Sequence, residues 1–251
     1  MSAPPLLDFE WRTLAGVRAA FTTRLGGVSE APWDSFNVAS HVGDAPDSVT
    51  RNRVDLRALL NLPAEPAWLN QVHGVAVSDL DAGAPTSAPT TADAAVARGA
   101  GRVCVVMVAD CLPVLFASRD GGVIAAAHAG WRGLAAGVLE RTVAAMGVAG
   151  GELSAWLGPA ISQAHFEVGD EVRTEFVASD RGAAAYFKVN DRGRWEADLV
   201  GLARRRLAAL GVSDVSGGEW CTFADRERFF SHRRDGKGGR MAALIWRDER
   251  A

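Results

Sequence analysis

The segment 102–108 constrains the fold more than any other part of this sequence. After Arg102 it is continuously apolar, and valine is its commonest residue. Such a run is typical of a strand that is buried on both faces of a sheet. Two further strands are predicted at 113–117 and 122–127, as the arms of a hairpin around an Asp-Gly turn, and a late strand is predicted at 239–246.

Helical spacing of apolar residues alternates with these strands. It predicts helices over 47–60, with Asp47 as the cap, over 134–146, and over 197–210, with Gly211 at the stop. Buried strands combined with amphipathic helices indicate a layered α/β or α+β fold. The Pro-, Ser- and Thr-rich segment 81–91 is expected to be an exposed loop, so residues 1–251 are expected to form one domain.

Composition excludes several classes of protein. The formal net charge of −3 gives no general attraction to nucleic acid, and no apolar run approaches the roughly 20 residues of a membrane span. Neither nucleic acid nor a membrane is therefore an expected partner. The three cysteines are odd in number and far apart, which argues against a disulfide framework, and no secretory leader is recognisable. These features predict a cytoplasmic protein.

Three residues suited to metal binding stand where apolar segments end beside a turn: His73, Cys111 and His128. Two imidazoles and a thiolate suit Zn²⁺, and three protein ligands leave a fourth position for water or substrate. Zinc lowers the pKa of a bound water towards ~7. The spacing matches no short zinc motif. From the pattern alone, a buried cysteine and two ordinary hydrogen-bonded histidines remain the alternative.

The other cysteines and histidines are given structural roles. Cys104 and Cys221 are predicted to pack in the core, and His41 and His165 to lie in surface loops. Three segments could bind an anion: 22–27 with Arg24, 130–133 with Arg132 at a helix start, and a basic glycine-rich hairpin at 231–240 with Arg233.

Taken together, short motifs in a fixed order give the chain its resemblance to a known family. It resembles the YfiH family, also labelled polyphenol oxidase or laccase-domain proteins, from about residue 20 to residue 246. The matching segments are 23–27, 37–44, 52–53, 71–74, 109–113, 128–133, 158–161 and 230–234. One departure is Phe223, where relatives usually carry tyrosine.

The resemblance implies a fold, a metal site and an activity. The fold is one α/β domain of stacked mixed sheets flanked by helices, and the metal ligands are His73, Cys111 and His128. Zinc is the expected cofactor, with copper as the other candidate. The implied activities are phosphorolysis of adenosine, inosine and methylthioadenosine and deamination of adenosine. The expected partners are accordingly small molecules, namely a purine nucleoside and phosphate. Bacterial members are also linked to peptidoglycan editing on muropeptide precursors.

Roles for further residues follow as hypotheses. Asp110 is the candidate proton-shuttling carboxylate, or else it orients a metal ligand. Arg24, Arg132 and Arg233 are expected to hold phosphate, and Gln71 and Asn37 to contact base or ribose. A laccase is disfavoured, because the chain has five histidines and no His-x-His pair for a multicopper cluster.

Two other functional classes remain open. Cys111 and His128 could act without metal as nucleophile and base in an amidase, and such an enzyme, or a zinc hydrolase, would suit peptidoglycan editing. A metal-binding partner protein without activity is the other class. No apolar stripe or tail in the sequence favours it.

Overall fold

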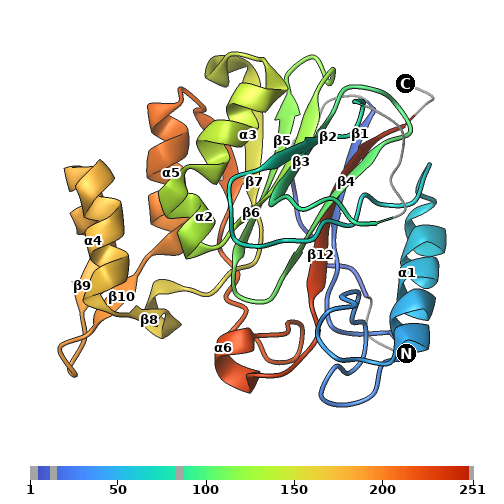
Figure 1. Ribbon diagram of the computed structural model, residues 1–251, viewed down its shortest axis with the longest axis horizontal. Coiled ribbons are helices and arrows are strands. Elements are labelled where there is room, and N and C mark those ends of the chain that lie inside the picture. The colour runs from blue at the N-terminus through green and yellow to red at the C-terminus, as the bar shows by residue number, and fades with distance from the viewer. Residues whose placement is uncertain (1–4, 12–15, 83–87, 249–251) are drawn as a thin grey trace.

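Figure 1 shows the computed structural model, which describes residues 5–11, 16–82 and 88–248. Its centre is a mixed six-stranded sheet in the order β11-β7-β5-β6-β3-β2. The pairs β11–β7 and β2–β3 are parallel, and the other neighbours are antiparallel. The strands are β2 (Val77–Asp79), β3 (Ala94–Ala97), β5 (Leu112–Ser118), β6 (Ile124–Ala129), β7 (Leu153–Leu157) and β11 (Asp214–Gly217).

A second, antiparallel sheet packs on one face of the first. It has the order β1-β12-β4, formed by β1 (Val17–Phe21), β12 (Met241–Arg247) and β4 (Val103–Val108). Cys104, Leu115 and Ile245 belong to the apolar cluster between the two sheets. Because β4 has this cluster on one side and helix α1 (Pro46–Leu60) on the other, both of its faces are buried.

Helices complete the layers (Figure 1). The outer face of the large sheet is covered by α2 (Trp131–Ala136), α3 (Val138–Met146) and α5 (Leu199–Ala209). A small sheet β8-β10-β9 and helix α4 lie to one side. These remaining elements are β8 (Glu167–Val168), β9 (Phe187–Val189), β10 (Trp195–Ala197), α4 (Asp170–Ser179), α6 (His232–Asp235) and the 3-10 turns Gly150–Glu152, Gln163–His165 and Arg181–Tyr186.

This architecture confirms the predicted α/β class with stacked sheets and flanking helices. It also confirms the buried strand at 103–108, the late strand, and the hairpin of β5 and β6. The prediction that the whole chain is one domain stays a prediction. The expected loop at 81–91 falls partly outside the described residues.

Three local predictions are wrong. Helix α1 begins at Pro46 after Ala45 with no side-chain cap, so Asp47 lies inside the first turn. The helix expected over 134–146 is two helices, because Gly137 adopts a left-handed conformation with φ 97° between α2 and α3. The expected hairpin at 231–240 starts instead with helix α6, whose Ser231 side chain accepts a hydrogen bond from the Arg234 N–H.

Replacing Leu115 by alanine tests the packing between the sheets. Its side chain is 0% exposed, so we expect the free energy of unfolding to fall by about 3 kcal/mol, the usual loss for a leucine removed from a core. Urea unfolding measures the change. Leu59→Ala on α1 is the matched control, since that side chain is 51% exposed. Equal losses in both variants would contradict the packing described above.

Candidate metal centre

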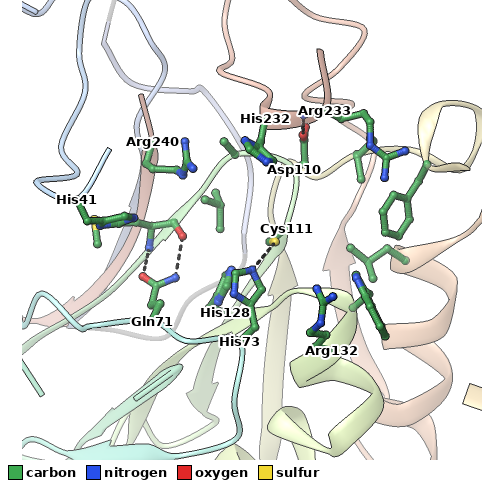
Figure 2. A pocket seen from close by; sticks show the side chains of 17 residues that line it. His41, Gln71, His73, Asp110, Cys111, His128, Arg132, His232, Arg233 and Arg240 are labelled. Carbon is green, nitrogen blue, oxygen red and sulfur yellow. Dashed lines mark hydrogen bonds between the residues drawn. The ribbon is translucent and has the colours of Figure 1, made fainter. Parts of the chain in front are cut away.

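One loop and the neighbouring ends of two strands bring His73, Cys111 and His128 together (Figure 2). His73 lies in the loop before β2, Cys111 directly precedes β5, and His128 lies near the end of β6. Their ligand atoms all lie within 4.8 Å of one another, and the Nε2 atom of His73 is 3.7 Å from the Cys111 Sγ atom. The two imidazole rings meet edge to face. The side chains that the sequence separates therefore converge on one point.

Two imidazole nitrogens and a thiol sulfur are donor types that zinc and copper both bind. A tetrahedral zinc site with usual Zn–S and Zn–N bonds of about 2.3 and 2.0 Å sets sulfur and nitrogen ligands about 3.5 Å apart. The His73–Cys111 distance of 3.7 Å is close to that value. His128 is buried, whereas Cys111 is half-buried and His73 exposed, so an ion held here would be reachable from solvent. The arrangement is that of a catalytic rather than a closed structural site.

Local backbone conformation favours this convergence. His73 and Asp110 have φ values of 61° and 89°, in the left-handed region that residues other than glycine rarely occupy. Such strain persists only where surrounding contacts hold it. Gly130, which precedes α2, is constrained in another way, because the ligands leave no room for a side chain at this position. A Cβ atom there would lie 2.8 Å from Cδ2 of His73 and 3.0 Å from the Cys111 sulfur.

Asp93, at the start of β3, ties two of the ligands together. Its carboxylate accepts hydrogen bonds from the backbone N–H groups of Val72, His73 and Gly74, at 3.2, 2.9 and 2.7 Å. It also lies 2.8 Å from Nδ1 of His128. If Nδ1 carries the proton that this contact implies, Nε2 of His128 is free to bind a metal. No role for Asp93 is predicted from the sequence, although a lone acidic residue within the apolar segment 92–97 is a usable signal.

The charges around the cluster favour a thiolate. Burial raises the pKa of the Cys111 thiol, but the imidazoles of His128 and His73 outweigh this and lower the pKa to about 6. Burial likewise opposes protonation of His128, yet the Cys111 sulfur and the Asp93 carboxylate raise its pKa to about 9. Both shifts favour a thiolate beside an imidazolium when no metal is bound, and a metal ion would displace the imidazolium proton.

The cluster forms part of the wall of a cavity of about 370 Å³, a size usual for small-molecule sites. Four of the other predicted site residues also line it: Gln71, Asp110, Arg132 and Arg233. The Gln71 amide is fixed by two hydrogen bonds to the backbone of Met107. Asp110 accepts hydrogen bonds from the Thr222 hydroxyl, at 2.7 Å, and from the Arg233 N–H, at 2.6 Å. Its carboxylate thus anchors the start of α6.

Two predicted contacts lie outside this cavity, which corrects the expectations for them. Asn37 is 0% exposed, and its amide bonds Ala39, Asp44 and the backbone of Arg240. The Arg24 guanidinium pairs with Asp34, donates to the Arg226 carbonyl and stacks on Phe230. Both side chains are occupied by intramolecular partners, so neither is placed to touch a ligand in the cavity.

Three residues for which the sequence predicts no individual site role also line the cavity, namely His41, His232 and Arg240; the last two belong to the segment 231–240, which was expected to bind an anion. His41 is exposed, as predicted, but it faces the cavity. Cys104 is buried as predicted, and His165 stacks on Phe223. The prediction of core packing for Cys221 is wrong, since its half-buried sulfur accepts hydrogen bonds from Ser162.

Gly130→Ala is expected to weaken metal binding without affecting the backbone. Gly130 has a φ of −62°, which alanine tolerates, so the change acts through the new methyl group against His73 and Cys111. We expect metal affinity to fall at least about tenfold, since a ligand must move by a few tenths of an ångström. Competition with a zinc-sensitive dye measures it. Gly151→Ala is the control, because nothing lies within 4 Å of a Cβ there, and equal affinities in the two variants would contradict the close approach.

Fold and cluster together define a mixed α/β protein with a candidate three-ligand metal centre beside a small-molecule cavity. The family described as multi-copper polyphenol oxidoreductase laccase matches residues 18–248. The chain belongs to this family, which includes the YfiH proteins, and the resemblance seen in its motifs is thereby confirmed.

Named relatives cover nearly the whole chain. The purine nucleoside phosphorylase PA4543 of Pseudomonas aeruginosa and the purine nucleoside phosphorylase YfiH of Escherichia coli are each 51% identical, over 94% of this chain and 96% of theirs. The crystal structure of Neisseria meningitidis protein NMB0706 matches with a TM-score of 0.91 and 46% identity, over 98% of this chain and 100% of that one. YlmD from Geobacillus stearothermophilus matches with a TM-score of 0.85 and 32% identity, over 99% and 98%. Separately, the described helices include none that is long and apolar enough to cross a bilayer.

Proposed function

We propose that this protein is a zinc-dependent purine nucleoside phosphorylase acting on adenosine, inosine and methylthioadenosine. The observation that carries the proposal is the His73–Cys111–His128 centre, exposed on one side in a cavity that also holds three arginines. Relatives that are 51% identical over nearly all of the chain bear the name of this activity. Copper is the other candidate metal for the same ligands.

The cavity offers features that suit both substrates. Trp131 and Phe166 present apolar rings near Arg132 and Arg233, which fits stacking of a purine base. In phosphorolysis a phosphate oxygen bonds to C1′ of the ribose while the C1′–N9 bond breaks, and the leaving base takes up a proton. Bound zinc would supply a Lewis acid towards a substrate oxygen. The positive charge of the arginines that line the cavity would draw anionic phosphate into it.

Asp110 is proposed as a positioning residue rather than a proton shuttle. Both of its carboxylate oxygens already accept hydrogen bonds, from Thr222 and from the N–H of Arg233. Its role would then be to hold Arg233 at the cavity wall. Gln71, whose amide is bound to Met107, would likewise shape the wall.

Adenosine deamination is the proposed second activity. It needs water in place of phosphate at the same exposed side of the metal centre.

The thiolate–imidazolium pair of Cys111 and His128 favours a different candidate, a metal-free hydrolase of an amide bond such as that of a muropeptide. A laccase is disfavoured, because the described residues hold one group of three potential ligands and the sequence has no His-x-His pair.

Product analysis tests the proposal. Zinc-loaded protein is incubated with adenosine, with and without phosphate, and the products are separated by chromatography. Adenine with ribose 1-phosphate, formed only when phosphate is present, is the expected result, and inosine marks deamination. Activity that resists chelators but is lost to iodoacetamide would instead identify the metal-free pair. Absence of both purine products would overturn the nucleoside proposal.

A further inference from the structure

The cavity has a second basic end that the predicted site residues leave out. Arg240 and His41 line it on one side of Cys111, whereas Arg132 and Arg233 lie on the other side (Figure 2). The two ends thus flank the metal centre. Their lining differs, because the rings of Trp131 and Phe166 contact the guanidinium groups of Arg132 and Arg233.

Arg240 is a half-buried cation whose guanidinium is bound by backbone carbonyls. Its Nη1 atom donates to the carbonyl oxygens of Gly238 and Gly239, both at 3.0 Å, which fixes the guanidinium from one side. Within the described ranges it forms no ion pair. Burial lowers the pKa of Arg240, and the negative groups that oppose this are Cys111 and Asp110. Binding of an anion would offset the unfavourable burial of this charge.

The surroundings of Arg240 add positive potential and a further hydrogen-bonding group. Burial and the charges of Arg240 and Arg53 lower the pKa of His41, so its ring is neutral at pH 7 and donates one N–H. The Arg53 guanidinium is held by the Val38 carbonyl and stacks on Trp68. Among the described residues that line the cavity, the one acidic side chain is Asp110, which is occupied by Thr222 and the Arg233 backbone.

One buried residue holds the two parts of this end in register. The Asn37 side-chain oxygen accepts hydrogen bonds from the N–H of Arg240, at 2.9 Å, and from the N–H of Ala39, at 3.0 Å. It therefore joins the loop that carries His41 to the segment that carries Arg240. The buried Asn37 side chain therefore fixes the relative position of the two segments that form this subsite.

We propose that Arg240, assisted by His41, binds the inorganic phosphate co-substrate at the end of the cavity opposite the purine base. The assignment rests on the proposed phosphorylase function. Displacement at C1′ requires the attacking phosphate oxygen to approach from the face opposite the breaking C1′–N9 bond. A base stacked near Trp131 and Phe166 therefore places phosphate across the metal centre, at Arg240. Arg132 and Arg233 would then serve mainly the nucleoside.

Titration calorimetry of zinc-loaded protein with inorganic phosphate measures the phosphate affinity directly, so it tests the assignment without requiring turnover. We expect Arg240→Met to weaken phosphate binding about tenfold or more, the usual effect of losing a charge-assisted contact. His41→Gln should weaken it by about threefold. Arg132→Met and Arg233→Met should change it by less than about threefold and should raise the KM for nucleoside instead. Zinc content and the unfolding midpoint show whether each variant is folded. If Arg240→Met is not folded, the His41→Gln variant tests the assignment, because His41 is exposed.

Three outcomes would overturn the assignment: no phosphate binding by the wild type, unchanged binding in Arg240→Met, or a larger loss in Arg132→Met or Arg233→Met. Adenosine 5′-monophosphate distinguishes free phosphate from a phosphate ester. If it binds more tightly than adenosine in an Arg240-dependent way, the subsite takes the ester and our assignment fails. Arg240-dependent phosphate binding without phosphorolysis products would instead refute the proposed function and leave the subsite intact.

Discussion

Replacing Cys111 by alanine is expected to remove the bound metal and abolish turnover. The sulfur is the only anionic donor of the three ligands, and its thiolate form is favoured by the neighbouring imidazoles. Loss of hydrogen-bond partners of metal ligands alone lowers affinity 10–100-fold, so loss of a ligand should exceed about 100-fold. Elemental analysis of purified protein should show about one zinc per chain in the wild type and almost none in the variant.

Cys221→Ser is the matched control for this change. Its sulfur is half-buried like that of Cys111, but its hydrogen-bond donors are Ser162 and Ala224 rather than the histidines. We expect it to keep its zinc and its activity. The same experiment separates metal catalysis from the thiolate–imidazolium alternative. If wild-type protein contains no metal and Cys111→Ala is inactive while chelators leave the wild type active, the metal-based proposal is wrong.

The sequence singled out His73, Cys111 and His128 because each stands where an apolar segment ends, and the family resemblance made them the predicted ligand set. Strands β5 and β6 pair so that Pro113 stands opposite His128, which brings Cys111 and His128 to one edge of the sheet. A short apolar run that is rich in β-branched residues, such as 103–108, predicts a strand from its own length and composition. Local signals of this kind fix the elements and the residues at their ends.

The sequence does not predict which segments far apart in the chain contact one another. Asp93 acts through a carboxylate that accepts N–H groups twenty residues away, and nothing in the segment 92–97 indicates which loop will supply them. Arg240 reaches the cavity because Asn37 pins its backbone, a pairing over 203 residues. Asn37 is expected from the sequence to contact a ligand, but its side chain is buried and accepts the Arg240 N–H, so it supports the cavity wall instead. Contacts between these loops depend on how the sheets and helices pack on one another, and no short segment encodes that packing.

Asp93→Asn is expected to cause the other large loss, in metal affinity and in stability together. The carboxylate is 0% exposed and meets four N–H groups, three from the loop 72–74 and one from His128. An amide presents its own NH₂ group to some of these donors, which leaves them without an acceptor. We expect zinc affinity to fall 10–100-fold and the free energy of unfolding to fall by about 3 kcal/mol.

The two effects can be measured apart because they arise at different steps. Zinc competition is carried out at a temperature where the unfolding curve shows the variant to be folded, and stability is measured on metal-free protein. Asp55→Asn is the control, since that carboxylate makes only an exposed ion pair with Arg51 and should change stability by less than about 0.5 kcal/mol. If folded Asp93→Asn bound zinc as tightly as the wild type, Asp93 would stabilise the loop without orienting His128. A loss of affinity that persists in the folded variant would show that one buried carboxylate sets the direction of both histidine ligands.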